Sequence, residues 1–253
     1  MTYQALIFDL LDGTAIPLQQ DGAPSQRLID AVHWAHAHSA LKLCAATGRA
    51  ITKAKYIFDA LQLTDPCVIS AGTQIVDPMT DKILWQMAIP EADVAKVLQT
   101  CMRYPYEILC GNEVLGEGKP ASQRQAVTTN VMYIMGCSQG HAQLILDDLK
   151  AVPDIKAIGV GSWTLHGVDI HVTHKQATKE HAITELLRML NIPKEATIGI
   201  GDDNNDINLF NGVGHRIAMG NAKEELKALA DEVCGSVDSD GLAEVIERYG
   251  GGI

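Results

Sequence analysis

Four short polar stretches of the chain carry residue types that could do chemistry together. They are Asp9 and Asp12 in DLLDGT, Thr47 and Gly48 in TGR, Lys179 in TKEH, and Asp202, Asp203, Asn205 and Asp206 in GDDNND. Carboxylates are ligands that Mg²⁺ prefers in proteins. A lysine supplies a point charge for a phosphate, and hydroxyl and amide groups donate hydrogen bonds to it. The set therefore suits a hard metal ion together with a phosphoryl group.

Each of these stretches lies where an expected core strand ends or an expected helix begins. Short apolar runs closed by turn residues predict buried parallel strands at 3–9, 41–47, 67–72, 196–202 and 215–220. Apolar residues at helical spacing predict helices at 25–39, 50–63, 175–192, 205–213 and 222–230. In open α/β sheets, ligands bind beyond the carboxyl ends of the strands, where the strand order reverses. We therefore expect the four stretches to converge there.

The alternation of strands and helices is interrupted near Pro90. From there we expect a helix followed by two strands, and then a second helix followed by two more strands. The sequence therefore predicts an α/β fold, with a Rossmann-like parallel sheet core at 1–82 and 175–253. A smaller α+β domain at 83–174 is inserted into it. A chain of 253 residues is long enough for this arrangement.

The composition disfavours several classes of partner and compartment. Acidic residues outnumber basic ones by 31 to 20, and the net charge of −11 disfavours nucleic acid and anionic membrane surfaces. An anionic substrate would then need local cations or a bound metal to reverse the field at its site. We expect no signal peptide and no membrane-spanning stretch, and six cysteines without a C-x-x-C pair suit reduced thiols. These features predict a cytoplasmic protein.

Taken in order, DGT, TGR, the lysine before a helix and GDDNND resemble the motifs of haloacid dehalogenase (HAD) superfamily phosphatases. The resemblance is to the Cof-like branch, whose HAD-like core carries an inserted α+β cap. It covers residues 3–82 and 175–253, including the tail that begins IAMGNAKEELKALADEV. It implies a Mg²⁺-dependent phosphomonoester hydrolase that works through an aspartyl-phosphate intermediate. The implied substrate is a small phosphorylated metabolite, with sugar phosphates as candidates.

The resemblance also implies a role for each matching residue. Asp9 would be the nucleophile, and Asp12 would be the general acid and base. The implied phosphate contacts are Thr47, the backbone at Gly48, Lys179 and Asn205. The implied metal site comprises Asp9, Asp12, Asp202, Asp206 in a supporting position, and Asp203 in the outer shell.

The first motif departs from the family pattern by one residue. The family has D-x-D-G-T, whereas this chain has D-L-L-D-G-T, and in a regular strand an offset of three points Asp9 and Asp12 to opposite faces. A bulge at Leu10 and Leu11 would restore the pairing. Alternatively, Leu10 takes the place of the nucleophile and the site is inactive. In a third arrangement Asp12 is the nucleophile, with Thr14 two residues later.

Two other functions stay open at this point. A phosphosugar mutase would need cations in the cap for a second phosphate, and Arg103 and Arg124 stand nearly alone there. A non-catalytic phosphometabolite-binding protein is favoured if Leu10 displaces the nucleophile. The cap region, 83–174, carries no motif that identifies a particular substrate.

Overall fold

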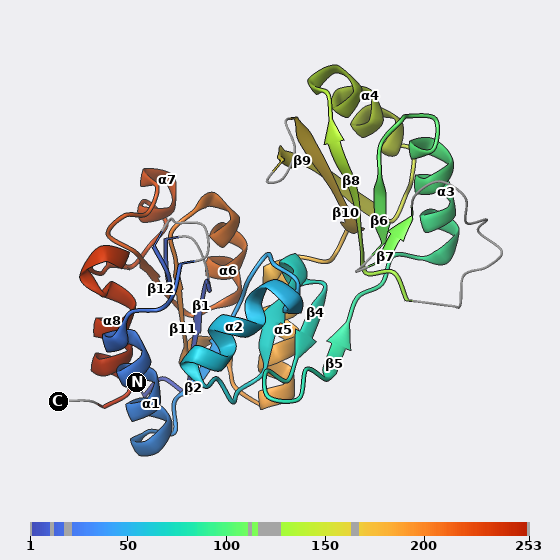
Figure 1. Cartoon of the computed structure of the whole chain (residues 1–253). Coiled ribbons are helices and arrows are strands. Elements are labelled where there is room, and N and C mark those ends of the chain that lie inside the picture. The colour runs from blue at the N-terminus through green and yellow to red at the C-terminus, as the bar shows by residue number, and fades with distance from the viewer. Residues whose placement is uncertain are drawn as a thin grey trace. The chain divides into compact units, whose positions relative to one another are not determined.

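The computed structural model of the chain describes residues 2–10, 13–17, 22–110, 113–115, 128–162 and 167–251. The chain forms two compact units (Figure 1). Met1–Trp85 and Thr178–Ile253 form one, here called the core unit, and Gln86–Ala177 forms the other, here called the inserted unit. The boundaries drawn from the sequence, after residues 82 and 174, fall three residues before these two transitions. Each unit has its own cluster of buried apolar side chains.

The core unit alternates strands and helices along the chain. Its strands are β1 (Ala5–Phe8), β2 (Lys42–Ala45), β3 (Cys67–Ile69), β4 (Gln74–Val76), β5 (Ile83–Gln86), β11 (Thr197–Gly201), β12 (His215–Ala218) and β13 (Glu232–Val233). Its helices are α1 (Gln26–His38), α2 (Ile51–Leu61), α5 (Lys179–Leu190), α6 (Ile207–Gly212), α7 (Glu224–Lys227) and α8 (Gly241–Tyr249). Short 3₁₀ helices include η4 (Asn204–Asp206).

A parallel sheet with the strand order β13-β12-β11-β1-β2 forms the centre of the core unit. Strand β1 is wholly buried, as expected for a central parallel strand covered on both faces. Helices α1 and α8 pack together on one side of this sheet, and α5 and α6 pack together on the other (Figure 1). The predicted α/β fold with a parallel central sheet is confirmed. Because β1 and β11 are neighbours although they lie far apart in sequence, the sheet joins both halves of the core unit.

The third expected strand is shorter than the sequence predicts. The prediction extends it to residue 72, but β3 ends at Ile69. The next three residues, Ser70, Ala71 and Gly72, have φ angles of 50°, 58° and 93°. These values lie in the left-handed region, which is incompatible with an extended strand. Strands β3, β4 and β5 form a separate small sheet, which meets β2 through a bridge between Ala46 and Val68.

Over its described residues, the inserted unit consists of an antiparallel sheet and two helices. Its helices are α3 (Glu91–Cys101) and α4 (Gln139–Leu149), and its strands are β6 (Ile108–Cys110), β7 (Glu113–Leu115), β8 (Val131–Cys137), β9 (Ile155–Gly161) and β10 (Val168–His174). The strand order is β7-β6-β8-β10-β9. The side chains of Met132 and Ile134 in β8 and of Ile170 and Val172 in β10 are wholly buried, so one face of the sheet packs in the apolar cluster with both helices. Among the described residues, none of the helices combines the length and apolar character that crossing a bilayer requires.

Candidate active site

Two neighbouring strands of the central sheet each end in an aspartate. Asp9 follows β1 directly, and Asp202 follows β11 directly. The two strands run parallel with Phe8 opposite Ile200, and the backbone N–H of Asp9 donates to the carbonyl of Ile200 at 2.9 Å. The register therefore places both carboxylates at the same edge of the sheet.

Lys179 and Asp206 complete a buried cluster at this edge. The ammonium of Lys179, the first residue of α5, donates to Oδ1 of Asp9 at 2.6 Å and to Oδ1 of Asp206 at 2.7 Å. Carboxylate oxygens of Asp9, Asp202 and Asp206 all lie within 4.8 Å of one another, and the three residues are buried. We call these three aspartates and Lys179 the acidic cluster. Within the described part of the chain, they are the one group of acidic, histidine or cysteine ligands spaced to hold a metal ion.

Asp206 is held in place from both of its oxygens. While Oδ1 accepts from Lys179, Oδ2 accepts from the backbone N–H groups of Asp202 and Asp203, at 3.1 Å and 3.3 Å. The backbone passes so close that a Cβ at Gly201 would lie 2.5 Å from the Cβ of Asp206. A glycine is therefore required at the start of GDDNND for this turn to close.

The charges of the acidic cluster do not balance within the protein. The cluster contains three buried carboxylates and one ammonium group, which leaves an excess of negative charge within it when all are ionised. Burial, together with the carboxylates of Asp9 and Asp206, raises the pKa of Asp202 to about 7. Burial works against the charged form of Lys179, but the adjacent carboxylates of Asp206 and Asp9 raise its pKa above the ordinary value. A hard divalent cation would supply the missing charge, and oxygen donors are what it prefers, so the residues fit Mg²⁺.

The structure answers part of the question raised by the extra leucine. The carboxylate of Asp9 lies in the acidic cluster, whereas the side chain of Leu10 is wholly buried in the apolar core of the unit. The arrangement in which Leu10 takes the place of the nucleophile is therefore wrong. Leu11 and Asp12 lie outside the described residues, and with them the expected bulge and the roles assigned to Asp12.

Thr14, which enters the sequence-based expectations only in the third arrangement of the first motif and without a metal or phosphate contact, lies against the acidic cluster. Its buried hydroxyl donates to Oδ1 of Asp202 at 2.6 Å. Gly13, just before it, has a φ of 126°, and a Cβ there would lie 2.2 Å from Oδ2 of Asp202. Only glycine fits such an approach. The sequence does contain a signal for Thr14, because its hydroxyl is a hydrogen-bond donor that directly follows two motif residues, Asp12 and Gly13.

The other expected phosphate contacts lie at the same sheet edge or on the surface. Thr47 follows β2, the neighbour of β1, and is buried, with its Oγ1 accepting from the backbone N–H of Arg49 at 3.1 Å. Gly48 is exposed, and no atom lies within 4 Å of where its Cβ would be. Asn205 is exposed in η4. A phosphate could therefore reach the backbone at Gly48 without displacing a side chain.

The carboxylate of Asp203, which we expected in the outer metal shell, contacts residues outside the acidic cluster. Its carboxylate pairs with Lys223 at 2.5 Å and accepts from the backbone N–H of Asn204, which caps η4. Although burial works in the opposite direction, these hydrogen bonds lower the pKa of Asp203. Asp202 and Asp206 of GDDNND therefore belong to the acidic cluster, whereas Asp203 stabilises the turn between them.

Comparison with known proteins identifies a matching family. A model of the family described as haloacid dehalogenase-like hydrolase matches residues 6–116 and 119–246. The matched ranges contain all the residues of the acidic cluster.

The chain is also similar to individual curated proteins over part of its length. It is 35% identical to phosphoglycolate phosphatase 1 of Saccharolobus solfataricus over 82 residues, which is 32% of this chain and 36% of that protein. It is 35% identical to phosphatase YwpJ of Bacillus subtilis over 80 residues, 32% of this chain and 28% of that protein. The chain thus spans about a third of the length of these curated relatives.

Among solved structures, the chain resembles a haloacid dehalogenase-like hydrolase from Bacteroides thetaiotaomicron. The TM-score is 0.82 at 20% identity, with 98% of this chain and 99% of that chain covered. At this level of identity, the likeness concerns the fold.

Proposed function

The chain belongs to the haloacid dehalogenase-like hydrolase family, and on this premise we propose that it is a Mg²⁺-dependent phosphomonoester hydrolase. The observation that carries the proposal is the acidic cluster, in which Asp9 shares Lys179 with Asp206 beside Asp202. A nucleophile, a fixed cation and oxygen ligands for a metal then lie at one edge of the sheet. Phosphoryl transfer needs this combination, because its catalysis consists mainly of positioning and charge stabilisation.

In this proposal, Asp9, Asp202 and Asp206 hold Mg²⁺, with Asp12 and Asp203 as further members of the site. The bound ion would neutralise charge on the phosphoryl oxygens. Three carboxylates to one ammonium group in this buried cluster support this assignment, because an excess of buried negative charge costs folding free energy. Thr14 keeps one oxygen of Asp202 in a defined place.

The covalent chemistry is assigned to Asp9. Its carboxylate attacks phosphorus and forms an aspartyl-phosphate while the bond to the leaving oxygen breaks. Asp12 protonates that oxygen and later takes a proton from the attacking water. Lys179, Thr47, the backbone at Gly48 and Asn205 contact the phosphoryl oxygens. The hydrogen bond from Lys179 orients the carboxylate of Asp9.

The substrate class in this proposal is a small phosphorylated metabolite, with sugar phosphates as candidates. Similarity to proteins named phosphoglycolate phosphatase and phosphatase supports a small phosphomonoester. The inserted unit is proposed as the cap that selects the leaving group. A mutase would need a second phosphate site there, and Arg103 is paired with Asp148 at 3.2 Å, whereas Arg124 lies outside the described residues.

Hydrolysis of p-nitrophenyl phosphate tests the proposal. We expect turnover with Mg²⁺ that is abolished by a chelator and falls roughly a thousandfold or more in Asp9→Asn, because the nucleophile is removed. Asp30→Asn, which neutralises an exposed aspartate on α1, is the matched control and should retain wild-type activity. Turnover that appears only after deletion of Leu11 would show that the extra residue disables the site.

A further inference from the structure

Asn221, in the loop after β12, links two segments that are distant in sequence. Its Nδ2 donates to the carbonyl of Gly13 at 2.8 Å. Its Oδ1 accepts from the backbone N–H of Val237 at 2.8 Å. One amide thus uses its donor and its acceptor to tie the loop at 13–17 to the turn that precedes α8.

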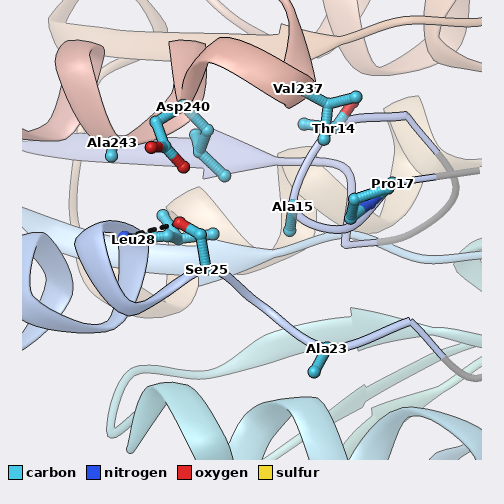
Figure 2. Close-up of a pocket in the computed structure, with 10 residues that line it drawn as sticks. Thr14, Ala15, Pro17, Ala23, Ser25, Leu28, Val237, Asp240 and Ala243 are labelled. Carbon is cyan, nitrogen blue, oxygen red and sulfur yellow. Dashed lines mark hydrogen bonds between the residues drawn. The ribbon is translucent and has the colours of Figure 1, made fainter.

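Besides its contacts in the apolar core, the loop at 13–17 borders a cavity on the side that faces this second turn. A cavity of about 80 Å³ lies there, and Figure 2 shows Thr14 and Pro17 of the loop lining it together with Val237 and Ala243. A void offers its lining atoms no partners for van der Waals contact. The hydrogen bond from Asn221 therefore adds a fixed contact on this side, while Ala15 and Ile16 of the loop pack in the apolar core of the unit.

The contact with Asn221 reaches the acidic cluster in two further steps. The Gly13 carbonyl belongs to the peptide bond that joins Gly13 to Thr14. The hydroxyl of Thr14 donates to Asp202 at 2.6 Å, and Gly13 itself packs against the same carboxylate. A rotation of this peptide would therefore move both the hydroxyl and the Gly13 backbone away from Asp202.

We propose that Asn221 is a positioning residue that sets the Gly13–Thr14 peptide against Asp202, and through it the metal-binding geometry of the acidic cluster. The proposal rests on the proposed function in assigning the metal to this cluster. The hydrogen bonds of Asn221 described above do not involve the three clustered carboxylates. Asn221 therefore acts on them indirectly, through the hydrogen bond that its amide donates to the Gly13 carbonyl. The bond from the Val237 N–H occupies the other end of the same amide and is not needed for this role.

Three variants separate the two hydrogen bonds of this amide. Asn221→Ala removes both, and Asn221→Asp keeps the acceptor for Val237 but loses the donor to Gly13. Of these two hydrogen bonds, Val237→Pro removes only the one from the Val237 N–H, and it keeps a small apolar side chain against the core. Val237 is the first residue of a 3₁₀ helix and the preceding Ser236 is extended, so the backbone tolerates proline. Gln26→Ala, which removes an exposed side-chain amide bonded to Asp30, is the matched control.

We expect both Asn221 variants to lower kcat for p-nitrophenyl phosphate and to weaken Mg²⁺ binding, each roughly tenfold, with little change in KM. Val237→Pro and Gln26→Ala should stay within about twofold of wild type for both quantities. Mg²⁺ affinity is measured by titration calorimetry with the metal alone, so it does not depend on turnover. Thermal unfolding identifies any variant that fails to fold.

The outcomes are separable. Wild-type kcat and Mg²⁺ affinity in Asn221→Ala would overturn the positioning role, and so would recovery of both in Asn221→Asp. If Val237→Pro lowers kcat and Mg²⁺ affinity as much as Asn221→Ala does, the positioning role belongs to the turn before α8 and not to the Gly13–Thr14 peptide. If the wild-type protein binds Mg²⁺ but does not hydrolyse the ester, the phosphatase proposal fails, and the Mg²⁺ affinities alone decide on Asn221.

Discussion

Asp202 shows how a single residue ties the stability of this protein to its metal site. It is buried at the end of β11, near the carboxylates of Asp9 and Asp206, and its pKa is raised to about 7. In the unfolded chain it would titrate near its ordinary value of 3.8. Between these two values the folded state keeps a proton that the unfolded state releases, so the free energy of unfolding falls as pH rises through this window.

The first prediction follows from this decrease of the free energy of unfolding with pH. In the presence of a chelator, the Tm of the protein should fall between about pH 5 and about pH 7.5, and Asp202→Asn should reduce that fall. The measurement is thermal unfolding at both pH values for wild type and variant, with Asp30→Asn as the control for loss of an exposed carboxylate. An identical pH dependence in wild type and Asp202→Asn would contradict the assignment.

At this scale, the sequence singles out all four residues of the acidic cluster, but not the contacts of the side chains around it. The convergence of Asp9, Asp202 and Lys179 could be predicted, because carboxyl ends of adjacent parallel strands share one edge of a sheet. The direction of Asp203 could not be predicted, because it depends on the capping of η4 and on Lys223. The contact of Thr14 depends on the backbone conformation at Gly13, which residue types alone do not specify.

At the scale of elements, the segment after β3 carries backbone strain close to the site. Ala71 adopts φ 58° and ψ 27°, which is unfavourable for a residue with a Cβ. Its N–H donates to the carbonyl of Thr47 at 3.2 Å. A Cβ at Gly72 would lie 2.3 Å from the backbone of Thr178, just before Lys179. The strained turn therefore packs between two stretches that carry expected phosphate contacts, where strain is often tolerated for function.

Replacing Ala71 by glycine should stabilise the protein, which is the second prediction. Relief of the left-handed conformation outweighs the extra entropy of glycine in the unfolded chain, and we expect a gain of about 0.5–1 kcal/mol. This corresponds to a rise in Tm of roughly 1–3 °C. Ala37→Gly, at an exposed position in α1, is the control with the opposite sign and should cost about 1 kcal/mol. A lower Tm in Ala71→Gly would refute the strain argument.

The same turn explains why the strand predicted at 67–72 is too long at its C-terminal end. Residues 67–72 form an apolar and small-residue run that is typical of a strand, yet β3 ends at Ile69. The backbone N–H of Ser70 donates to the carbonyl of Arg49, so the chain leaves the strand to contact the TGR loop. This contact is tertiary, and a local pattern of residue types does not encode it. Strands β1 and β11, by contrast, are fully buried runs that the pattern alone predicts.

At the scale of the whole molecule, every residue of the acidic cluster belongs to the core unit, but the residues come from both of its segments. Asp9 lies before the inserted unit in sequence, and Lys179, Asp202 and Asp206 lie after it. A metal ion held by this cluster would therefore join the two segments of the core unit. The inserted unit has a separate apolar cluster, so it does not depend on that ion for its packing.

The third prediction concerns where Mg²⁺ stabilises the protein. At a metal concentration about a hundredfold above Kd, the core unit should gain about 2.7 kcal/mol. Hydrogen exchange followed by mass spectrometry should then show slower exchange in β1 and β11 and unchanged exchange in β8 and β10. The Asp202→Asn variant is the control, in which this difference should shrink. Equal protection of both units, or protection confined to β8 and β10, would contradict a metal site in the core unit.

The central claim is that Asp9 forms the covalent bond to phosphorus, despite the extra leucine between Asp9 and Asp12. Borohydride reduces an acyl phosphate to an alcohol, so quenching the reaction during turnover and treating it with borohydride converts a phosphorylated aspartate to homoserine. Peptide mass spectrometry then locates the change. We predict homoserine at Asp9 only when substrate and Mg²⁺ are both present. Homoserine at Asp12, or none at either position during turnover, would contradict the account.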